Sequence, residues 1–193
     1  MAVGLLGGSF DPAHEGHRAV SLAALRMLDI DRVWWVVSPH NPLKARAPAS
    51  MERRMARARA VADHPRIQVT DVEARIGTRY TVDTVRALRE RLPGVSLVWL
   101  TGADALANLH RWHDWRGLAE AIPIVGFGRP GTRMAARRGA LARAYPRYRL
   151  GPSDARGIAR ETAPAWALLE MPLRAESSTA IRAAGGWAAS AKG

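Results

Sequence analysis

Residues 2–17 have the sequence AVGLLGGSFDPAHEGH. Residues 2–6 are apolar and predict a short buried strand, and an amphipathic stretch over residues 17–28 predicts a helix. Gly7 and Gly8 lie between them, where glycine lets the chain turn sharply and lets a ligand come close to the backbone. This stretch therefore predicts a strand, a tight turn and a helix, which form the first unit of an α/β fold.

Similar units follow along the chain. The other expected strands are residues 32–37, 67–70, 95–100, 122–127 and 166–171, and the other clear helices are residues 51–62, 81–92 and 112–121. Alternation of this kind predicts an α/β fold of Rossmann-like type, a mostly parallel sheet with helices on both faces. Because no long linker or internal repeat interrupts the 193 residues, we expect one domain over residues 1–193.

The chain is strongly basic, with a net charge of +12. Lys44 and Lys192 are its only lysines, so nearly all the positive charge is arginine. A basic surface suits nucleic acid or a small anionic substrate. The arginines are scattered through expected helices, as in residues 52–59, and this pattern favours solvated helix faces over a nucleic-acid surface. We therefore expect no nucleic-acid partner.

Cysteine is absent from the sequence, which excludes disulfides, thiolate catalysis and cysteine-ligated zinc. No apolar run approaches the roughly 20 residues that span a bilayer, and residues 1–6 lack the basic flank of a signal peptide. We therefore expect a cytoplasmic protein with no membrane partner, whose chemistry uses oxygen and nitrogen groups.

His14 and His17 follow the glycine turn, where a helix is expected to begin within residues 12–17. Exposed backbone N–H groups and the helix dipole favour an anion there, and two histidines three residues apart lie on nearly the same helix face. A metal site is the less favoured alternative, because no third ligand is evident nearby. A dinucleotide site is disfavoured, because Gly-x-Gly-x-x-Gly is missing from this turn. The expected ligand is phosphate.

Residues 7–17 resemble the Gly-Gly-[Ser/Thr]-Phe-Asp-Pro-x-His-x-Gly-His signature of the nucleotidyltransferase superfamily. The resemblance implies that His14 and His17 contact the triphosphate of ATP. It also implies an ATP-binding turn made by Gly7, Gly8, Ser9 and Phe10. Class I aminoacyl-tRNA synthetases share a related His-x-Gly-His element, but this chain is too short for their usual additional domains.

Near the other end, residues 177–182 combine hydroxyls suited to a helix start with an arginine that can contact phosphate oxygens. Alone, such a hexapeptide is more often an ordinary capped helix. It is similar to the motif that closes the phosphate site in the same superfamily, which implies ATP contacts from Ser177, Ser178, Thr179 and Arg182. Glu176 departs from that motif, which usually has an aliphatic residue there.

Four segments in the middle of the chain resemble the nicotinate mononucleotide adenylyltransferase family: residues 39–44, 77–84, 102–112 and 129–131. The resemblance implies that Arg129 lies near the adenosine. It further implies that Lys44 faces phosphates and that the mononucleotide is bound by Lys44, Tyr80, Thr81, Gly102, Asp104 and Trp112. A flat indole suits a planar pyridine ring, although core packing is the commoner fate of a tryptophan. We assign Trp34, Trp35 and Trp99 to packing.

The expected reaction joins ATP and nicotinate mononucleotide into nicotinate adenine dinucleotide and releases pyrophosphate. The attacking phosphate is already largely ionised at neutral pH, so the site needs cations and N–H donors rather than a base. His14, His17, Lys44 and Arg182 are the expected catalytic residues. Mg²⁺ is expected on the ATP phosphates, without a dedicated protein site. The alternatives are a nicotinamide mononucleotide or phosphopantetheine acceptor and, less favoured, a non-enzymatic nucleic-acid-binding protein.

Overall fold

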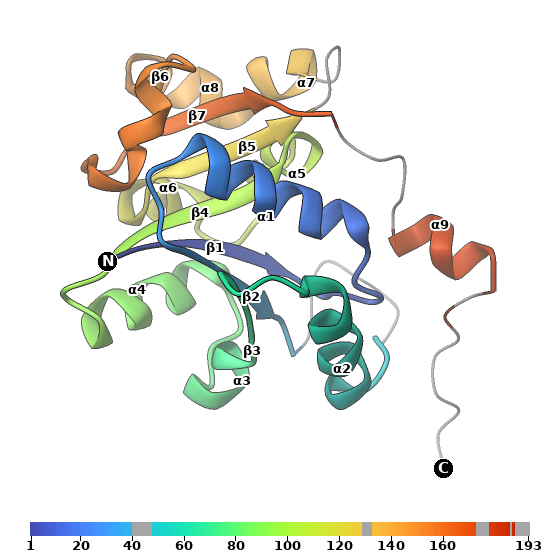
Figure 1. The fold of residues 1–193 in the computed structure, drawn as a ribbon. Coiled ribbons are helices and arrows are strands. Elements are labelled where there is room, and N and C mark those ends of the chain that lie inside the picture. The colour runs from blue at the N-terminus through green and yellow to red at the C-terminus, as the bar shows by residue number, and fades with distance from the viewer. Residues whose placement is uncertain (40–47, 129–132, 173–177, 186, 188–193) are drawn as a thin grey trace.

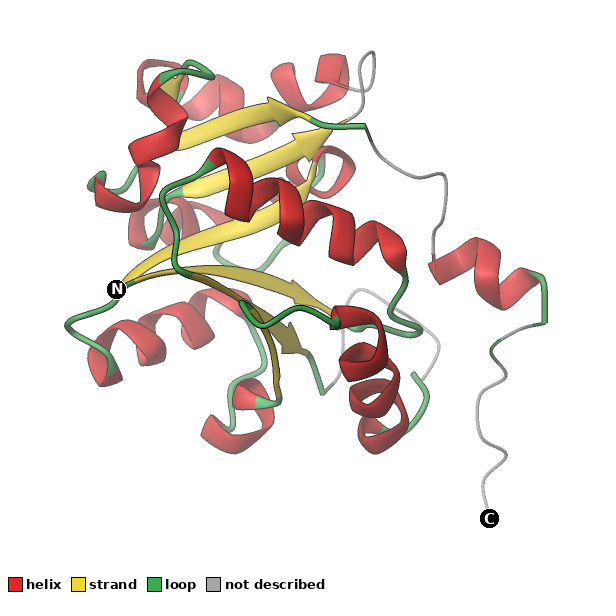
Figure 2. Cartoon of the chain, viewed as in Figure 1, coloured by secondary structure: helices red, strands yellow, loops and turns green. Residues whose placement is uncertain are grey.

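The computed structural model describes residues 1–39, 48–128, 133–172, 178–185 and 187 of the chain. Its strands form one seven-stranded sheet in the order β3-β2-β1-β4-β5-β7-β6, and every neighbouring pair is parallel. The strands are β1 (Ala2–Gly8), β2 (Arg32–Val37), β3 (Ile67–Thr70), β4 (Ser96–Gly102), β5 (Ile124–Gly128), β6 (Arg149–Leu150) and β7 (Trp166–Glu170). The α/β fold with a parallel sheet, predicted from the sequence, is confirmed (Figure 2). Only the two-residue β6 was not expected.

The α-helices of the described residues are α1 (Glu15–Met27), α2 (Met51–Ala62), α3 (Val72–Ile76), α4 (Thr81–Arg91), α5 (Ala103–Ala107), α6 (Trp115–Ala121), α7 (Arg133–Arg137), α8 (Ala140–Ala144) and α9 (Ser178–Ala183). Short 3₁₀ helices cover Leu109–Arg111, Pro146–Tyr148 and Asp154–Arg160. The predicted helix over 112–121 was wrong at its start. Trp112 is extended, and Asp114, with φ 42°, caps α6 by accepting a hydrogen bond from the N–H of Gly117.

Helices cover both faces of the sheet (Figure 1). Apolar residues of α1, α2 and the 3₁₀ helix Asp154–Arg160 pack on one face, and those of α4, α5, α6 and α8 pack on the other. Trp35 and Trp99 are fully buried on opposite faces, as expected of packing residues. Trp34 is only half-buried, and its Nε1 donates a hydrogen bond to Gln68.

β1 lies at the centre of the sheet, with β2 on one side and β4 on the other. The chain leaves β1 toward β2 and β3 and later returns to β4 on the opposite side, so the strand order reverses beside β1. Ligands of open parallel sheets bind at such a reversal, outside the carboxyl ends of the strands. Gly7 and Gly8, paired with Val36 and Val37 of β2, stand at this position.

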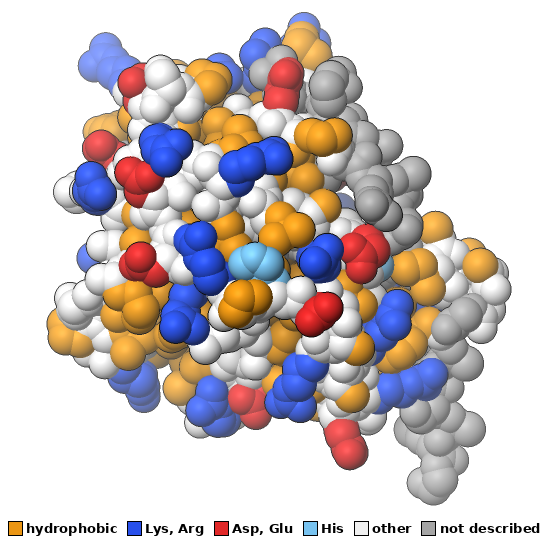
Figure 3. Space-filling model, viewed as in Figure 1, with side chains coloured by type: hydrophobic (Ala, Val, Ile, Leu, Met, Phe, Trp, Pro, Cys, Tyr) orange, Lys and Arg blue, Asp and Glu red, His pale blue; other side chains and the backbone are white. Residues whose placement is uncertain are grey.

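On the face drawn in Figure 3, arginine side chains are interspersed with acidic and apolar ones and do not form one continuous basic patch. No helix in the described part of the chain is long and apolar enough to span a bilayer.

Candidate functional site

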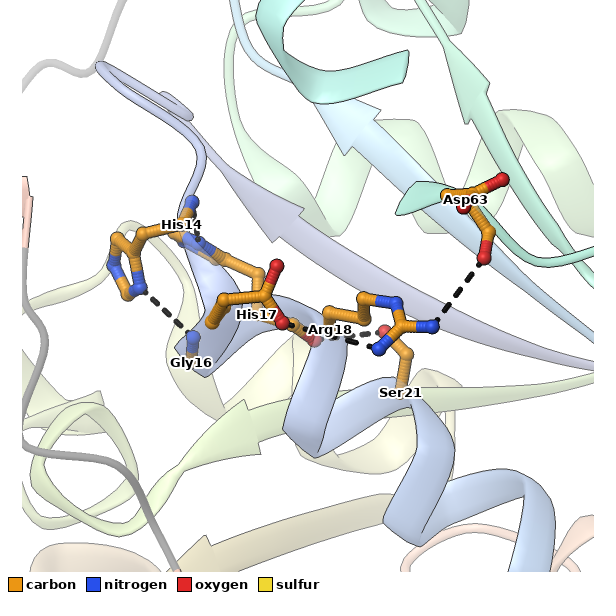
Figure 4. Close-up of polar contacts among 7 residues, drawn as sticks. His14, Gly16, His17, Arg18, Ser21 and Asp63 are labelled. Carbon is orange, nitrogen blue, oxygen red and sulfur yellow. Dashed lines mark hydrogen bonds and ion pairs between the residues drawn. The ribbon is translucent and has the colours of Figure 1, made fainter. Parts of the chain in front are cut away.

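The two histidines of the signature cap the start of α1 (Figure 4). His14 is the residue before the helix, in extended conformation, so the expectation that both histidines lie on the helix was wrong for His14. Its Nδ1 accepts a hydrogen bond from the N–H of Gly16 at 3.1 Å, and the Nδ1 of His17 accepts one from the N–H of His14 at 3.2 Å. The imidazoles thus satisfy N–H groups that would lack partners at a helix start.

This arrangement determines which nitrogen carries the proton. Because Nδ1 is an acceptor in both rings, the proton of each neutral imidazole lies on Nε2. The two ring centroids are 4.0 Å apart. The start of α1 therefore holds two adjacent Nε2–H donors, which suit the oxygens of a phosphate group.

Phe10 holds this loop against the core. Its ring is 1% exposed, stacks on Trp35 at a centroid distance of 5.0 Å and contacts the ring of His17 at 4.7 Å. Its backbone has a φ of 46°, in the left-handed region that non-glycine residues rarely adopt. A ligand at the signature would therefore meet the Phe10 backbone and not its ring.

A cavity of about 400 Å³ opens at the carboxyl end of β1. It brings together residues predicted for the two substrates, Gly7, Gly8 and Ser9 for ATP and Tyr80, Thr81 and Trp112 for the mononucleotide. Gly7 is required here, because a Cβ at this position would overlap the indole of Trp99. Trp112 is half-buried and meets Trp99 edge-on at 6.0 Å. Tyr80 stacks on His113 at 4.0 Å.

Six other residues that line this cavity were not among the predicted site residues: Ser38, Glu73, Arg79, Trp99, Arg111 and His113. Arg111 and His113 flank Trp112, so their place beside the predicted tryptophan was the available signal. Arg79 directly precedes the predicted Tyr80 and lies within residues 77–84, one of the segments that resemble the family. No pattern in the sequence indicated Ser38 or Glu73.

Two buried side-chain atoms among the described residues lack a hydrogen-bond partner, Oε2 of Glu73 and Nε1 of Trp99. Both residues line the same cavity. Burial raises the pKa of Glu73, while hydrogen bonds with the hydroxyls of Ser38 and Thr84 oppose the rise. Unsatisfied buried polar atoms are rare in folded proteins and concentrate at functional sites.

A buried arginine braces the turn from behind. Arg54 of α2 is 1% exposed, and its guanidinium donates to the carbonyls of Ala49 at 2.8 Å, Ser9 at 2.7 Å, Ser38 at 2.8 Å and Pro39 at 3.3 Å. Burial lowers the pKa of Arg54, and the nearby charge of Asp11 opposes this. One planar cation thus joins the ends of β1 and β2, which both line the cavity.

The second predicted motif lies against the first. Ser178 Oγ donates to the carbonyl of Pro12 at 2.9 Å, and the guanidinium of Arg182 donates to the carbonyl of Asp11 and to the hydroxyl of Thr179. Ser178, Thr179 and Arg182 are therefore next to the signature turn, although more than 160 residues separate the two motifs in sequence.

Among the described residues, His14, His17 and Arg182 of the two motifs do not line the cavity. Gly102 is at the carboxyl end of β4 and Asp104 is exposed in α5, and neither lines the cavity. Lys44, Arg129, Ser177 and the departure at Glu176 lie outside the described residues.

A second hollow of about 730 Å³ is larger, but it lies near the amino ends of β4 and β5. Arg89, Glu120 and Arg160 are among its lining residues, and it contains none of the predicted site residues. Elsewhere in the part of the chain that the structure describes, no group of three or more His, Asp or Glu side chains is placed to hold a metal ion.

Residues 5–184 match the family model described as Cytidylyltransferase-like. A protein of Ruegeria sp. (strain TM1040), named "Probable nicotinate-nucleotide adenylyltransferase", is 51% identical over 187 residues, which cover 97% of this chain and 99% of that protein. The chain belongs to the nicotinate-nucleotide adenylyltransferase family. The family predicted from the sequence is therefore confirmed.

Other members of the family agree with this assignment. A protein of the same name from Ruegeria pomeroyi is 53% identical over 193 residues, covering all of this chain and 91% of that protein. The solved structure of a Plasmodium falciparum nicotinic acid mononucleotide adenylyltransferase complexed with NaAD matches with a TM-score of 0.70 and 17% identity, over 94% of this chain and 82% of that one. At this low identity the structural match supports the fold alone.

Proposed function

We propose that the chain transfers the adenylyl group of ATP to nicotinate mononucleotide, giving nicotinate adenine dinucleotide and pyrophosphate. One observation supports this most strongly: the cavity at the end of β1 combines the phosphate-type turn of Gly7 and Gly8 with the aromatic wall of Tyr80 and Trp112. A turn that admits phosphates and a wall that suits a planar ring are the two features a mononucleotide acceptor needs beside ATP. The names of the relatives point to the same reaction.

The signature supplies the phosphate chemistry in this proposal. The phosphate of the mononucleotide attacks the α-phosphorus of ATP, a P–O bond forms, and the bond to the β-phosphate oxygen breaks. His14 and His17 direct Nε2–H donors at the triphosphate, and Arg182 lies one hydrogen bond from the same turn. These groups neutralise charge that accumulates on the leaving pyrophosphate. Lys44 and Arg129 are further proposed contacts.

Arg182 must change partners to take part. In the structure its guanidinium is bonded to the carbonyl of Asp11 and to Thr179. Ionic bonds to phosphate are stronger than bonds to a neutral carbonyl. We therefore infer that ATP draws Arg182 from the turn toward the triphosphate.

We propose that Mg²⁺ binds together with ATP. Mg²⁺ prefers phosphate oxygens and water, and it commonly uses only one or two protein carboxylates. Asp11 is a carboxylate of the signature turn and is 8% exposed, but its Oδ1 already accepts from Trp187 and Ala49. The described residues of this turn therefore suit a Mg²⁺ ion that is held mainly by the ATP phosphates and water.

The direct test is a pyrophosphate-release assay with purified protein, ATP and Mg²⁺, run with nicotinate mononucleotide, nicotinamide mononucleotide and phosphopantetheine in parallel. We expect the highest kcat/KM with nicotinate mononucleotide. A preference for phosphopantetheine would overturn the acceptor, and release with none of the three would overturn the proposal.

A further inference from the structure

Among the described residues that line the cavity, Glu73 is the one with an acidic side chain. It lies on α3 and is 5% exposed. Nicotinate mononucleotide carries a ring carboxylate and a phosphate, so a fixed negative charge in this wall would oppose its binding. The position of Glu73 therefore needs an explanation beyond packing.

The carboxyl group connects two walls of the cavity. Its Oε1 accepts a hydrogen bond from the hydroxyl of Thr84 at 3.1 Å, and the hydroxyl of Ser38 bonds to the same carboxyl group. Ser38 follows β2 and lines the cavity, while Thr84 is on α4, one turn after Tyr80 and Thr81. The Thr84 hydroxyl is also within 3.2 Å of the carbonyl of Tyr80 and 2.8 Å of the Thr78 hydroxyl.

Burial of Glu73 favours a neutral acid over a carboxylate, and the hydrogen bonds with the hydroxyls of Ser38 and Thr84 oppose this. Oε2 is buried without a partner, and no ion pair to Glu73 is found within the described ranges. An ionised carboxylate buried with one unsatisfied oxygen is far more costly than a neutral carboxylic acid in the same place. The direction of the pKa of Glu73, raised by burial, agrees.

We propose that Glu73 is a positioning residue for the pyridine mononucleotide: its neutral carboxyl ties the end of β2 to the start of α4 and keeps the cavity wall uncharged. This inference rests on the proposed function, because it concerns the same substrate. Glu73 acts through Ser38, Thr84 and the Tyr80–Thr81 backbone and does not itself contact the reacting atoms.

Other charged and titratable groups surround Glu73 and set the background of any pH profile. These are Asp71 and Arg75 of α3, which pair with each other, Asp83 of α4, Arg54 behind Ser38, and Arg79, Tyr80, Arg111 and His113 around the cavity. The Glu73→Gln variant keeps all of them and removes the ability of residue 73 to ionise. The difference between wild type and this variant therefore isolates Glu73.

The sign of the expected effect follows from the charge. As pH rises through the raised pKa of Glu73, the charge of its carboxylate should repel the anionic substrate, so the KM for nicotinate mononucleotide should rise. The KM of Glu73→Gln should lack this component. Nicotinamide mononucleotide has no ring carboxylate, so its KM should rise less in the wild type.

The test measures KM and kcat for both substrates between pH 6 and 9 in the wild type, Glu73→Gln, Glu73→Ala and, as a matched control, Glu90→Gln on the exposed side of α4. We expect Glu73→Ala to raise the mononucleotide KM about tenfold, the effect of one or two lost hydrogen bonds, with the ATP KM unchanged. Thr84→Val removes the partner hydroxyl and should raise the same KM.

The inference is overturned if Glu73→Gln retains the wild-type pH dependence of the mononucleotide KM, or if Glu73→Ala changes both KM values equally. If Glu73→Ala does not fold, the pH dependence of the mononucleotide KM in wild type and Glu73→Gln still tests the role of Glu73. Failure of the proposed function is distinct, because the wild type would then give no dinucleotide with nicotinate mononucleotide.

Discussion

Nε1 of Trp187 donates a 2.7 Å hydrogen bond to Oδ1 of Asp11, across 176 positions of sequence. The guanidinium of Arg53 lies over the Trp187 ring at 4.2 Å from its centroid. Asp11 belongs to the signature turn and also accepts from the N–H of Ala49 just before α2. One carboxylate therefore links the signature turn, the start of α2 and the end of the chain.

Replacing Trp187 with Phe keeps an aromatic ring for Arg53 and removes the N–H donor. We expect a loss of about 1 kcal/mol in unfolding free energy, the net value of one hydrogen bond, and a severalfold fall in kcat/KM for ATP. Trp34→Phe is the matched control, because it removes a surface indole hydrogen bond to Gln68. Steady-state kinetics and denaturant unfolding measure both. Equal kcat/KM values for ATP in the two variants would contradict a role for Trp187 at the signature.

His17 is predicted to stabilise charge on the triphosphate. His17→Ala should lower dinucleotide formation by about two to three orders of magnitude, as expected when one preorganised donor to a developing charge is lost. It should cost about 1 kcal/mol of stability, because the Nδ1 cap on His14 N–H is lost as well. The exposed His110 provides the control in His110→Ala. Near-normal turnover of folded His17→Ala would exclude the proposed role.

Trp112 is predicted to bind the pyridine ring. Trp112→Ala should raise the KM for the mononucleotide about tenfold, since stacking on an aromatic ring contributes roughly 0.5–1.5 kcal/mol beyond burial. Trp115→Ala removes another half-buried tryptophan, which meets Tyr145 edge-on and does not line the cavity. That control should lose stability without a change in KM. If Trp112→Ala behaves in the same way, Trp112 is a packing residue.

Arg54 is predicted to be essential for the arrangement of the turn. Arg54→Met leaves several carbonyls without a donor and should destabilise the fold by about 3–5 kcal/mol, since each unsatisfied buried group costs roughly 1–3 kcal/mol. Arg54→Lys keeps the charge but cannot bond to all four carbonyls at once, so we expect an intermediate loss. Exposed Arg57 on the same helix gives the control Arg57→Lys. Thermal and urea unfolding should rank the variants in this order, and a wild-type midpoint for Arg54→Met would refute the prediction.

Stability should also depend on pH through Glu73. Because burial raises its pKa in the folded state, the folded protein binds this proton more tightly than the unfolded chain. This contribution is fully present below the ordinary glutamate pKa of about 4.3 and is lost as pH rises through the raised value. Urea unfolding should therefore show that the unfolding free energy of Glu73→Gln increases relative to that of the wild type as pH rises. A difference that does not vary with pH would contradict a neutral Glu73.

The sequence predicted the strands and the main motifs because both are local. Continuous apolar stretches indicate β1, β2 and β4, and the residues of the signature follow one another in the sequence. The structure differs from the sequence prediction at features that depend on contacts between residues far apart in the chain. The bonds of Arg54 to the carbonyls of Ser9 and Ser38 join positions up to 45 residues apart, and no local pattern indicates them. The short helix α3 that holds Glu73 was missed, since five residues are too few for a periodic signal.

The caps of α1 and α6 show another limit. The spacing of His14 and His17 predicted that both lie on one face of a helix. His14 instead occupies the N-cap position, where Ser or Asp is usual, and lies just before the helix. Asp114 caps α6 three residues later than the apolar pattern indicated, which leaves Trp112 extended and able to face the cavity.

In the proposed reaction the adenylyl group, and not a terminal phosphate, is transferred to the pyridine mononucleotide. The most direct measurement supplies ATP labelled either at the α-phosphate or at the γ-phosphate, together with nicotinate mononucleotide and Mg²⁺, and follows the label by chromatography. We predict that the α-label appears in nicotinate adenine dinucleotide and the γ-label in pyrophosphate. Transfer of the γ-label to the mononucleotide, or release of inorganic phosphate without dinucleotide, would contradict the account.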